Sequence, residues 1–131
     1  MSCAVIGDSI AQGVAAQMPQ CAALAHKGWT SARWRHQYQT RRIDADRVVI
    51  SLGSNDFGAD TGPTLESIRA QVKARQVVWI APAHHAAPVL AVAAAHGDAV
   101  VPIPALSPDS IHPTPRGYRQ IAREITRKDA A

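Results

Sequence analysis

A chain of 131 residues with a net charge of +4 is long enough to bury one hydrophobic core without a metal or a disulfide framework. Hydrophobic residues make up 47% of the chain and charged residues 18%, which is the balance of an ordinary globular protein. No apolar run approaches the roughly 18 residues of a membrane span, which excludes an integral helical membrane protein. We therefore expect a single domain over residues 1–131.

Short apolar runs alternate along the chain with segments of helical periodicity. The first run, residues 3–6, ends at Gly7 and precedes a helix predicted over 9–18, where apolar side chains recur every four residues. Further strands are predicted over 21–25, 47–52, 76–81 and 99–103, and further helices over 31–39, from 63, over 88–96 and from 115. This repeated βα alternation predicts an α/β chain in which helices cover both faces of a parallel sheet.

Chemically active residue types follow four of the predicted strands. The segments are Gly7-Asp8-Ser9, Gly28-Trp29-Thr30-Ser31, Gly53-Ser54-Asn55-Asp56 and Asp109-Ser110-Ile111-His112. Ligands of such sheets bind outside the carboxyl ends of the strands, so we expect these segments to meet at one edge.

The residue types in these segments suit nucleophilic catalysis by a serine. Ser9 is the candidate nucleophile, placed at the predicted start of a helix where the helix dipole favours negative charge. His112 can accept the hydroxyl proton as general base, and Asp109 can orient its ring from three residues earlier. Candidate donors to an oxyanion are the backbone N–H groups of Ser9 and Gly28 and the side-chain amide of Asn55.

The four segments resemble the four sequence blocks of the SGNH hydrolases, also called GDSL-type esterases and lipases. Gly7-Asp8-Ser9-Ile10 matches the first block, Gly28 the second, Gly53-Ser54-Asn55-Asp56 the third, and Asp109 with His112 the fourth. The blocks occur in the family's order between residues 7 and 112, so the resemblance covers nearly the whole chain. It implies a three-layer, flavodoxin-like α/β/α fold with a five-stranded parallel sheet in the order 2-1-3-4-5. It also implies hydrolysis of esters or thioesters without a metal or other cofactor.

The chain is shorter than many members of that family, with brief loops after the third and fourth predicted strands. We therefore expect a shallow cleft that favours short acyl groups, such as acetyl on a carbohydrate or polysaccharide. Five basic residues and no acidic residue lie between Ser9 and Ile43, which would suit an anionic polymer. No nucleic-acid-binding motif is present, so no nucleic-acid partner is expected. The oligomeric state is left open.

Three other functions compete with the short-chain esterase. A lysophospholipase or thioesterase would use the same chemistry, and a carbohydrate-binding domain would use the same cleft without turnover. A flavodoxin-like nucleotide binder is disfavoured, because the segment from Gly7 to Gly13 carries neither the dinucleotide nor the P-loop signature. No signal peptide is visible, which favours the cytoplasm, whereas a leader removed earlier would indicate secretion.

Several residues outside the four blocks have open roles. Cys3 and Cys21 are expected to be small buried residues, with their pairing undecided. His84 and His85 follow the fourth predicted strand, and adjacent side chains rarely point the same way, so a metal site there is disfavoured. His26 is expected to be exposed. Other expectations concern Asp8, a structural acceptor for loop N–H groups, and Trp29, either a wall of the pocket or part of the core.

Overall fold

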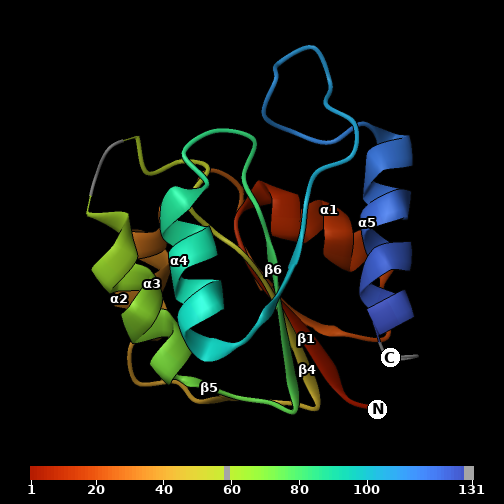
Figure 1. Cartoon of the computed structure of the whole chain (residues 1–131). Helices are drawn as coiled ribbons and strands as arrows, with labels where there is room; N and C mark the ends of the chain where they lie inside the picture. Colours follow the sequence, from red (N-terminus) through yellow and green to blue (C-terminus); the bar gives the residue numbers. More distant parts are fainter. Residues whose placement is uncertain (58–59, 129–131) are drawn as a thin grey trace.

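The computed structural model describes residues 1–57 and 60–128, which form a parallel sheet covered by helices (Figure 1). The strands of the five-stranded sheet are β1 (Cys3–Gly7), β2 (Ala22–Ala25), β4 (Arg47–Ser51), β6 (Gln76–Ile80) and β7 (Ala99–Val101). They pair in parallel in the order β2-β1-β4-β6-β7. Counted along the chain, this is the predicted order 2-1-3-4-5, which is confirmed.

Five helices cover the two faces of this sheet. They are α1 (Ser9–Gln17), α2 (Ser31–Tyr38), α3 (Thr61–Ala70), α4 (Ala87–His96) and α5 (Pro115–Arg127). Each prediction agrees with the observed element to within one or two residues at its start. Within the described part of the chain, no helix is both long enough and apolar enough to cross a membrane.

Alternation along the strands creates two separate cores. Successive strand residues point to opposite faces, so Val49 faces one core while Val48 and Ile50 face the other. One core packs α1 and α5 against the sheet through apolar residues such as Ile10 and Ile121. The other packs α2, α3 and α4 on the opposite face (Figure 1). The predicted three-layer α/β/α arrangement is confirmed.

A second, two-stranded parallel sheet was not predicted. It pairs β3 (Ile43–Asp44) with β5 (Val72–Lys73), close to the ends of α2 and α3. Each of these strands has only two residues, which is too short to show the alternation that identifies a strand in a sequence.

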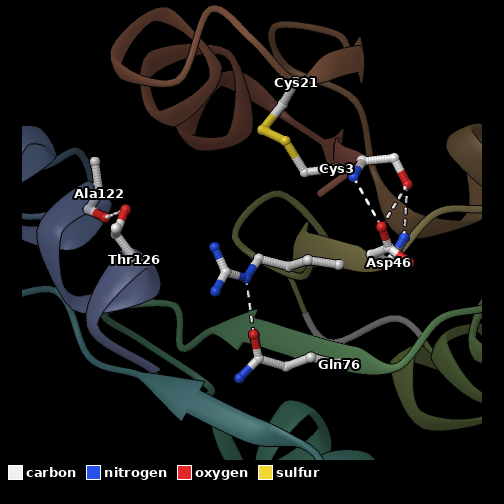
Figure 2. The surroundings of a disulfide bond; sticks show 8 residues. Cys3, Cys21, Asp46, Gln76, Ala122 and Thr126 are labelled. Carbon is white, nitrogen blue, oxygen red and sulfur yellow. Dashed lines mark hydrogen bonds between the residues drawn. A yellow bond between two sulfur atoms is a disulfide. The ribbon is translucent and has the colours of Figure 1, made fainter. Parts of the chain in front are cut away.

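The structure corrects the expectation for the cysteines. Cys3 and Cys21 form a disulfide, with 4.7 Å between their Cα atoms, and both residues are half-buried. The bond joins the start of β1 to the residue before β2 (Figure 2), whereas Ser9 follows the other end of β1. Asp46 braces the same end of β1 by accepting hydrogen bonds from the backbone N–H and the hydroxyl of Ser2. The two cysteines can pair because β1 and β2 lie side by side, and the spacing of the cysteines in the sequence does not reveal this neighbourhood.

Candidate active site

Ser9, His112 and Asp109 form a continuous line of hydrogen bonds. The hydroxyl oxygen of Ser9 lies 2.8 Å from Nε2 of His112. On the other side of the ring, Nδ1 of His112 lies 2.6 Å from a carboxylate oxygen of Asp109. Because a carboxylate only accepts, Nδ1 carries the proton and Nε2 presents its lone pair to the hydroxyl. The structure thus brings together three of the five predicted site residues.

The turn between β1 and α1 holds Ser9 at the first position of its helix. Gly7 has a φ of 140°, and a Cβ at this position would lie 1.8 Å from the carbonyl oxygen of Ser51. Only glycine fits between the two strands there. Asp8 then caps the helix by accepting from the N–H groups of Ile10 and Ala11, at 3.0 and 3.4 Å. The N–H of Ser9 donates no hydrogen bond within the described part of the chain.

Asp8 is a buried acid beneath the nucleophile. One of its carboxylate oxygens also accepts a 3.2 Å hydrogen bond from the hydroxyl of Ser51, and the other has no partner among the described residues. Burial raises its pKa to about 6, against the opposing effect of the hydrogen bonds that it accepts. Burial and the nearby charges of Asp8 and Asp109 also raise the pKa of Tyr118. The hydrogen bonds support the structural role expected for Asp8.

The loop that carries His112 is braced internally. The N–H of Ser107 donates to the carbonyl of His112 at 2.8 Å, and that of Thr114 donates to Ala105 at 3.1 Å. Asp109 accepts three further hydrogen bonds of 2.9 Å on one carboxylate oxygen, from the hydroxyl of Ser107 and the N–H groups of Ile111 and His112. These backbone hydrogen bonds hold the pKa of Asp109 well below its usual range, so the carboxylate is ionised at neutral pH.

Gly28 and Asn55 lie on the loops after β2 and β4, the two strands that flank β1. The side-chain amide of Asn55 donates a 3.0 Å hydrogen bond to the carbonyl of Trp29, the neighbour of Gly28. Gly28 has a φ of 78°, is exposed, and has open space around the position of a Cβ. Its N–H donates no hydrogen bond within the described part of the chain. The Asn55 side chain is therefore tied to the loop that carries Gly28, and neither Gly28 nor Asn55 is hydrogen-bonded to Ser9.

Asp56 connects the loops after β2 and β4 through hydrogen bonds. Its carboxylate accepts from the backbone N–H of Ser31 at 2.9 Å and from the hydroxyl of Ser31 at 2.5 Å. It also accepts from the hydroxyl of Thr61 at 2.8 Å. The acid after Asn55 thus connects the loop after β4 to the starts of both α2 and α3.

An aromatic stack beside Gly28 was missed by the sequence analysis. The rings of His26 and Trp29 lie 3.8 Å apart and nearly parallel, and the guanidinium of Arg33 lies 4.5 Å from the ring centre of Trp29. His26 also shares a 2.5 Å hydrogen bond with the hydroxyl of Tyr38. The expectation that His26 is exposed is wrong, because this stack half-buries it. Trp29 packs partly against the core, in line with one of its two expected roles, and partly against His26; a role as a wall of the pocket stays a prediction.

His84 braces the loop of His112 from the neighbouring strand. Its Nε2 donates a 2.9 Å hydrogen bond to the carbonyl of Ser110, whose φ of 61° is unusual for a residue with a side chain. His84 and His85 also line a hollow of about 150 Å³, whose wall includes Ser54, Phe57 and Ile111. Ser54 and Ile111 are the chain neighbours of Asn55 and His112, so this hollow lies beside the loops of the site, although none of the five predicted site residues lines it. No group of three potential metal ligands occurs among residues 1–57 and 60–128.

Solved structures with the same fold were found by comparison. No protein-family model matches the chain, and no curated protein matches it. A GDSL-like lipase from Bacteroides thetaiotaomicron superposes with a TM-score of 0.72 and 19% identity, over 99% of this chain and 89% of the lipase. A lipase/acylhydrolase from Enterococcus faecalis gives 0.68 and 20% identity, over 98% and 95%.

A third structure belongs to an acetyltransferase. The C-terminal catalytic domain of the peptidoglycan O-acetyltransferase of Streptococcus pneumoniae gives a TM-score of 0.61 and 16% identity, over 96% of this chain and 90% of that domain. At such identities the likeness establishes the arrangement of the chain and not its chemistry. The chain therefore has the fold of the GDSL-like lipases and acylhydrolases, and the resemblance to the SGNH hydrolases predicted from its four segments is confirmed at the level of the fold.

Proposed function

We propose that this protein is an SGNH-type serine esterase that cleaves carboxylic esters through an acyl-Ser9 intermediate. The observation that carries the proposal is the hydrogen-bonded line from the Ser9 hydroxyl through His112 to Asp109, at 2.8 and 2.6 Å. Each residue in the line has the partner that its chemistry requires. A hydroxyl that merely caps a helix would not need a histidine oriented by a carboxylate.

His112 would move one proton in each half of the reaction. As the Ser9 oxygen attacks the carbonyl carbon, its proton passes to Nε2 of His112, and the carbonyl oxygen becomes an oxyanion. The bond to the alcohol then breaks, and the imidazolium gives that proton to the leaving oxygen. A water molecule repeats the sequence on the acyl-serine, releasing the acid and restoring the hydroxyl. Asp109 stabilises the positive ring and keeps the proton on Nδ1 throughout.

The oxyanion would be held by donors that are free in this structure. The N–H groups of Ser9 and Gly28 have no acceptor among the described residues. Asn55 uses one amide hydrogen on the carbonyl of Trp29, and its second hydrogen stays available. The loops of Gly28 and Asn55 follow the two strands that flank β1, which supports a shared role of the three donors at the carboxyl end of β1. Each donor of this kind contributes on the order of 3 kcal/mol to the transition state.

The hollow beside the site favours a short acyl group such as acetyl. Its volume of about 150 Å³ is small beside the roughly 300–1,000 Å³ of ordinary small-molecule pockets. An octanoyl chain would project beyond it. An acetyl xylan esterase from Butyrivibrio proteoclasticus has the same fold, with a TM-score of 0.58 and 12% identity, and the chain spans 62% of its length. Together with the O-acetyltransferase domain, it supports an acetylated carbohydrate as substrate, ahead of a lysophospholipid or a thioester.

The test compares hydrolysis of p-nitrophenyl acetate, butyrate and octanoate by the wild type, Ser9→Ala and Ser67→Ala. Ser67 lies on the exposed face of α3 and bonds only within its helix, so its variant is a matched control. We expect activity that falls with chain length, is unchanged in Ser67→Ala, and drops about 10⁶-fold in kcat in Ser9→Ala. The melting temperatures of both variants should match that of the wild type.

Two results would contradict this proposal in different ways. A folded Ser9→Ala variant with full activity would remove Ser9 from the reaction. A folded wild type that hydrolyses none of the esters, and whose Ser9 does not react with a fluorophosphonate probe, would favour the carbohydrate-binding alternative without turnover.

A further inference from the structure

The outer face of α5 carries a stripe of arginines. Arg116, Arg119, Arg123 and Arg127 are all exposed, and their spacings of three, four and four residues place them within an arc of about 80° on the helix. The stripe extends about 17 Å along the axis at 1.5 Å per residue. The opposite face of α5 is buried in the core through Ile121 and Ile125.

A groove lies beside this stripe, between α5 and the end of α1. Its volume is about 600 Å³, larger than that of the hollow lined by His84 and His85. Three of the four stripe arginines line it, together with polar side chains from the two helices and the following turn: Arg119, Arg123, Arg127, Gln17, Gln20 and Thr126. We call it the α5 groove.

The positive charge of the α5 groove is largely uncompensated. Arg127 forms an ion pair of 2.7 Å with Glu124, at the solvent-exposed surface. Arg119 and Arg123 form no ion pair with any described residue. Exposed like charges repel one another, so a stripe of this kind costs stability unless an anion neutralises it.

We propose that the α5 groove binds an acidic polysaccharide, the polymer whose ester groups the Ser9 site would cleave. Arginine matches a sugar carboxylate with two parallel N–H donors. The amides of Gln17 and Gln20 can both donate to and accept from sugar hydroxyls, and the hydroxyl of Thr126, which donates to the carbonyl of Ala122, can accept from them. A groove that presents both kinds of group fits a polymer that carries both.

The same observations disfavour two other polyanions. A helix that binds a lipid surface inserts its apolar face, and here that face is buried, with Ile121 and Ile125 both 0% exposed. Single-stranded nucleic acids stack their bases on aromatic rings, and the lining of the α5 groove holds none.

The position of the groove links it to the site. α5 begins three residues after His112, and α1 begins at Ser9 and ends beside the groove. The rise of α1 from Ser9 to Met18 is about 14 Å, which a few sugar residues can span. In this respect the inference rests on the proposed esterase function: the groove would hold the polymer while an acetyl group a few sugars away enters the site.

The test measures binding of polygalacturonate by titration calorimetry at low salt, with neutral dextran as the reference. The groove variant combines Arg119→Gln, Arg123→Gln and Arg127→Gln. The matched control removes the same three charges from exposed arginines beside the β3–β5 pair: Arg41→Gln, Arg42→Gln and Arg75→Gln. The groove variant loses three solvent-exposed ion pairs between arginines and carboxylates of the polymer. We therefore expect its Kd for polygalacturonate to rise about tenfold to fiftyfold, with little change in the Kd of the control. Dextran should not bind.

Several outcomes would overturn the inference. Equal weakening in both triple variants would mean that net charge alone attracts the polymer. Tighter binding of duplex DNA or of phosphatidylglycerol vesicles than of polygalacturonate would assign the groove to a different partner.

The two proposals fail in distinguishable ways. Hydrolysis of p-nitrophenyl acetate without binding of polygalacturonate would refute the groove and leave the esterase. Binding that depends on the groove, in a protein that hydrolyses no ester, would refute the esterase and leave the groove. If both hold, the groove variant should show a raised KM on acetylated polygalacturonate and an unchanged rate on p-nitrophenyl acetate.

Discussion

Replacing Asp109 by asparagine should disable the site while leaving its geometry intact. One carboxylate oxygen of Asp109 accepts three hydrogen bonds of 2.9 Å, and the other faces Nδ1 of His112 at 2.6 Å. In Asp109→Asn the amide oxygen must stay with the three donors, because the opposite orientation would place an NH₂ group against all of them. The NH₂ group therefore points at Nδ1, which must become an acceptor.

The consequence for His112 is a change of tautomer. With Nδ1 unprotonated, the neutral ring carries its proton on Nε2, the atom that faces the Ser9 hydroxyl at 2.8 Å. A protonated Nε2 cannot accept the hydroxyl proton, so the base is present but blocked. A wrong tautomer of this kind lowers kcat by about 10⁴-fold, equivalent to about 5 kcal/mol of transition-state stabilisation.

The assay is kcat on p-nitrophenyl acetate, with Asp109→Ala as the comparison. Alanine leaves the ring free to adopt either tautomer, so we expect Asp109→Ala to retain more activity than Asp109→Asn, despite losing the loop hydrogen bonds. Melting curves would verify that both variants fold. Activity of Asp109→Asn within tenfold of the wild type would refute the assignment of His112 as the base oriented by Asp109.

Two further predictions concern stability. Replacing Cys3 and Cys21 together by serine should destabilise the fold by about 3 kcal/mol, because the disulfide closes a loop of 18 residues. The Tm should fall by about 10 °C in calorimetry, and reduction of the wild type should lower it by the same amount. An unchanged Tm would contradict this prediction. Burial raises the pKa of Asp8 to about 6, so the folded state favours the protonated carboxyl. The stability that the protonated carboxyl contributes is fully present below about pH 4 and is lost as the pH rises through 6. The loss amounts to about 3 kcal/mol in the free energy of unfolding. Asp8→Asn keeps the acceptor oxygen but cannot ionise. Its free energy of unfolding in urea, relative to that of the wild type, should therefore rise by about that amount between pH 4 and 7. A difference between the two proteins that does not change with pH would argue against a buried charge at Asp8.

The main strands and helices could be predicted because the sequence marks many of their boundaries twice. Glycine or proline stops most of the predicted strands and helices, and the chemically active segments directly follow strand ends. The strand order 2-1-3-4-5 is what the resemblance of the four segments to the SGNH hydrolases implies, because parallel strands bring their carboxyl ends to one edge in any order. The observed order, with β1 between β2 and β4, agrees with it.

Features that depend on contacts between distant segments could not be predicted in the same way. The Cys3–Cys21 bond requires that the starts of two strands lie side by side, and β3 with β5 is held by partners about 30 residues apart. The stack of His26 and Trp29 requires a particular path of the loop around Gly28. None of these leaves a periodicity or a local motif in the sequence, so only the assembled chain reveals them.

Three aspartates belong to the four segments, and their surroundings give them different tasks. Asp8 is buried, keeps one oxygen unpartnered and has a raised pKa, whereas Asp56 is occupied by hydroxyl and N–H donors that join two loops. Asp109 is exposed, has a lowered pKa, and alone faces an imidazole. A carboxylate stabilises a positive ring only while it is ionised, and its backbone donors keep Asp109 ionised at acidic pH. Asp8 and Asp56 hold the segments of Ser9 and Asn55 in place. The role of each aspartate therefore depends on the hydrogen-bond donors that surround its carboxylate.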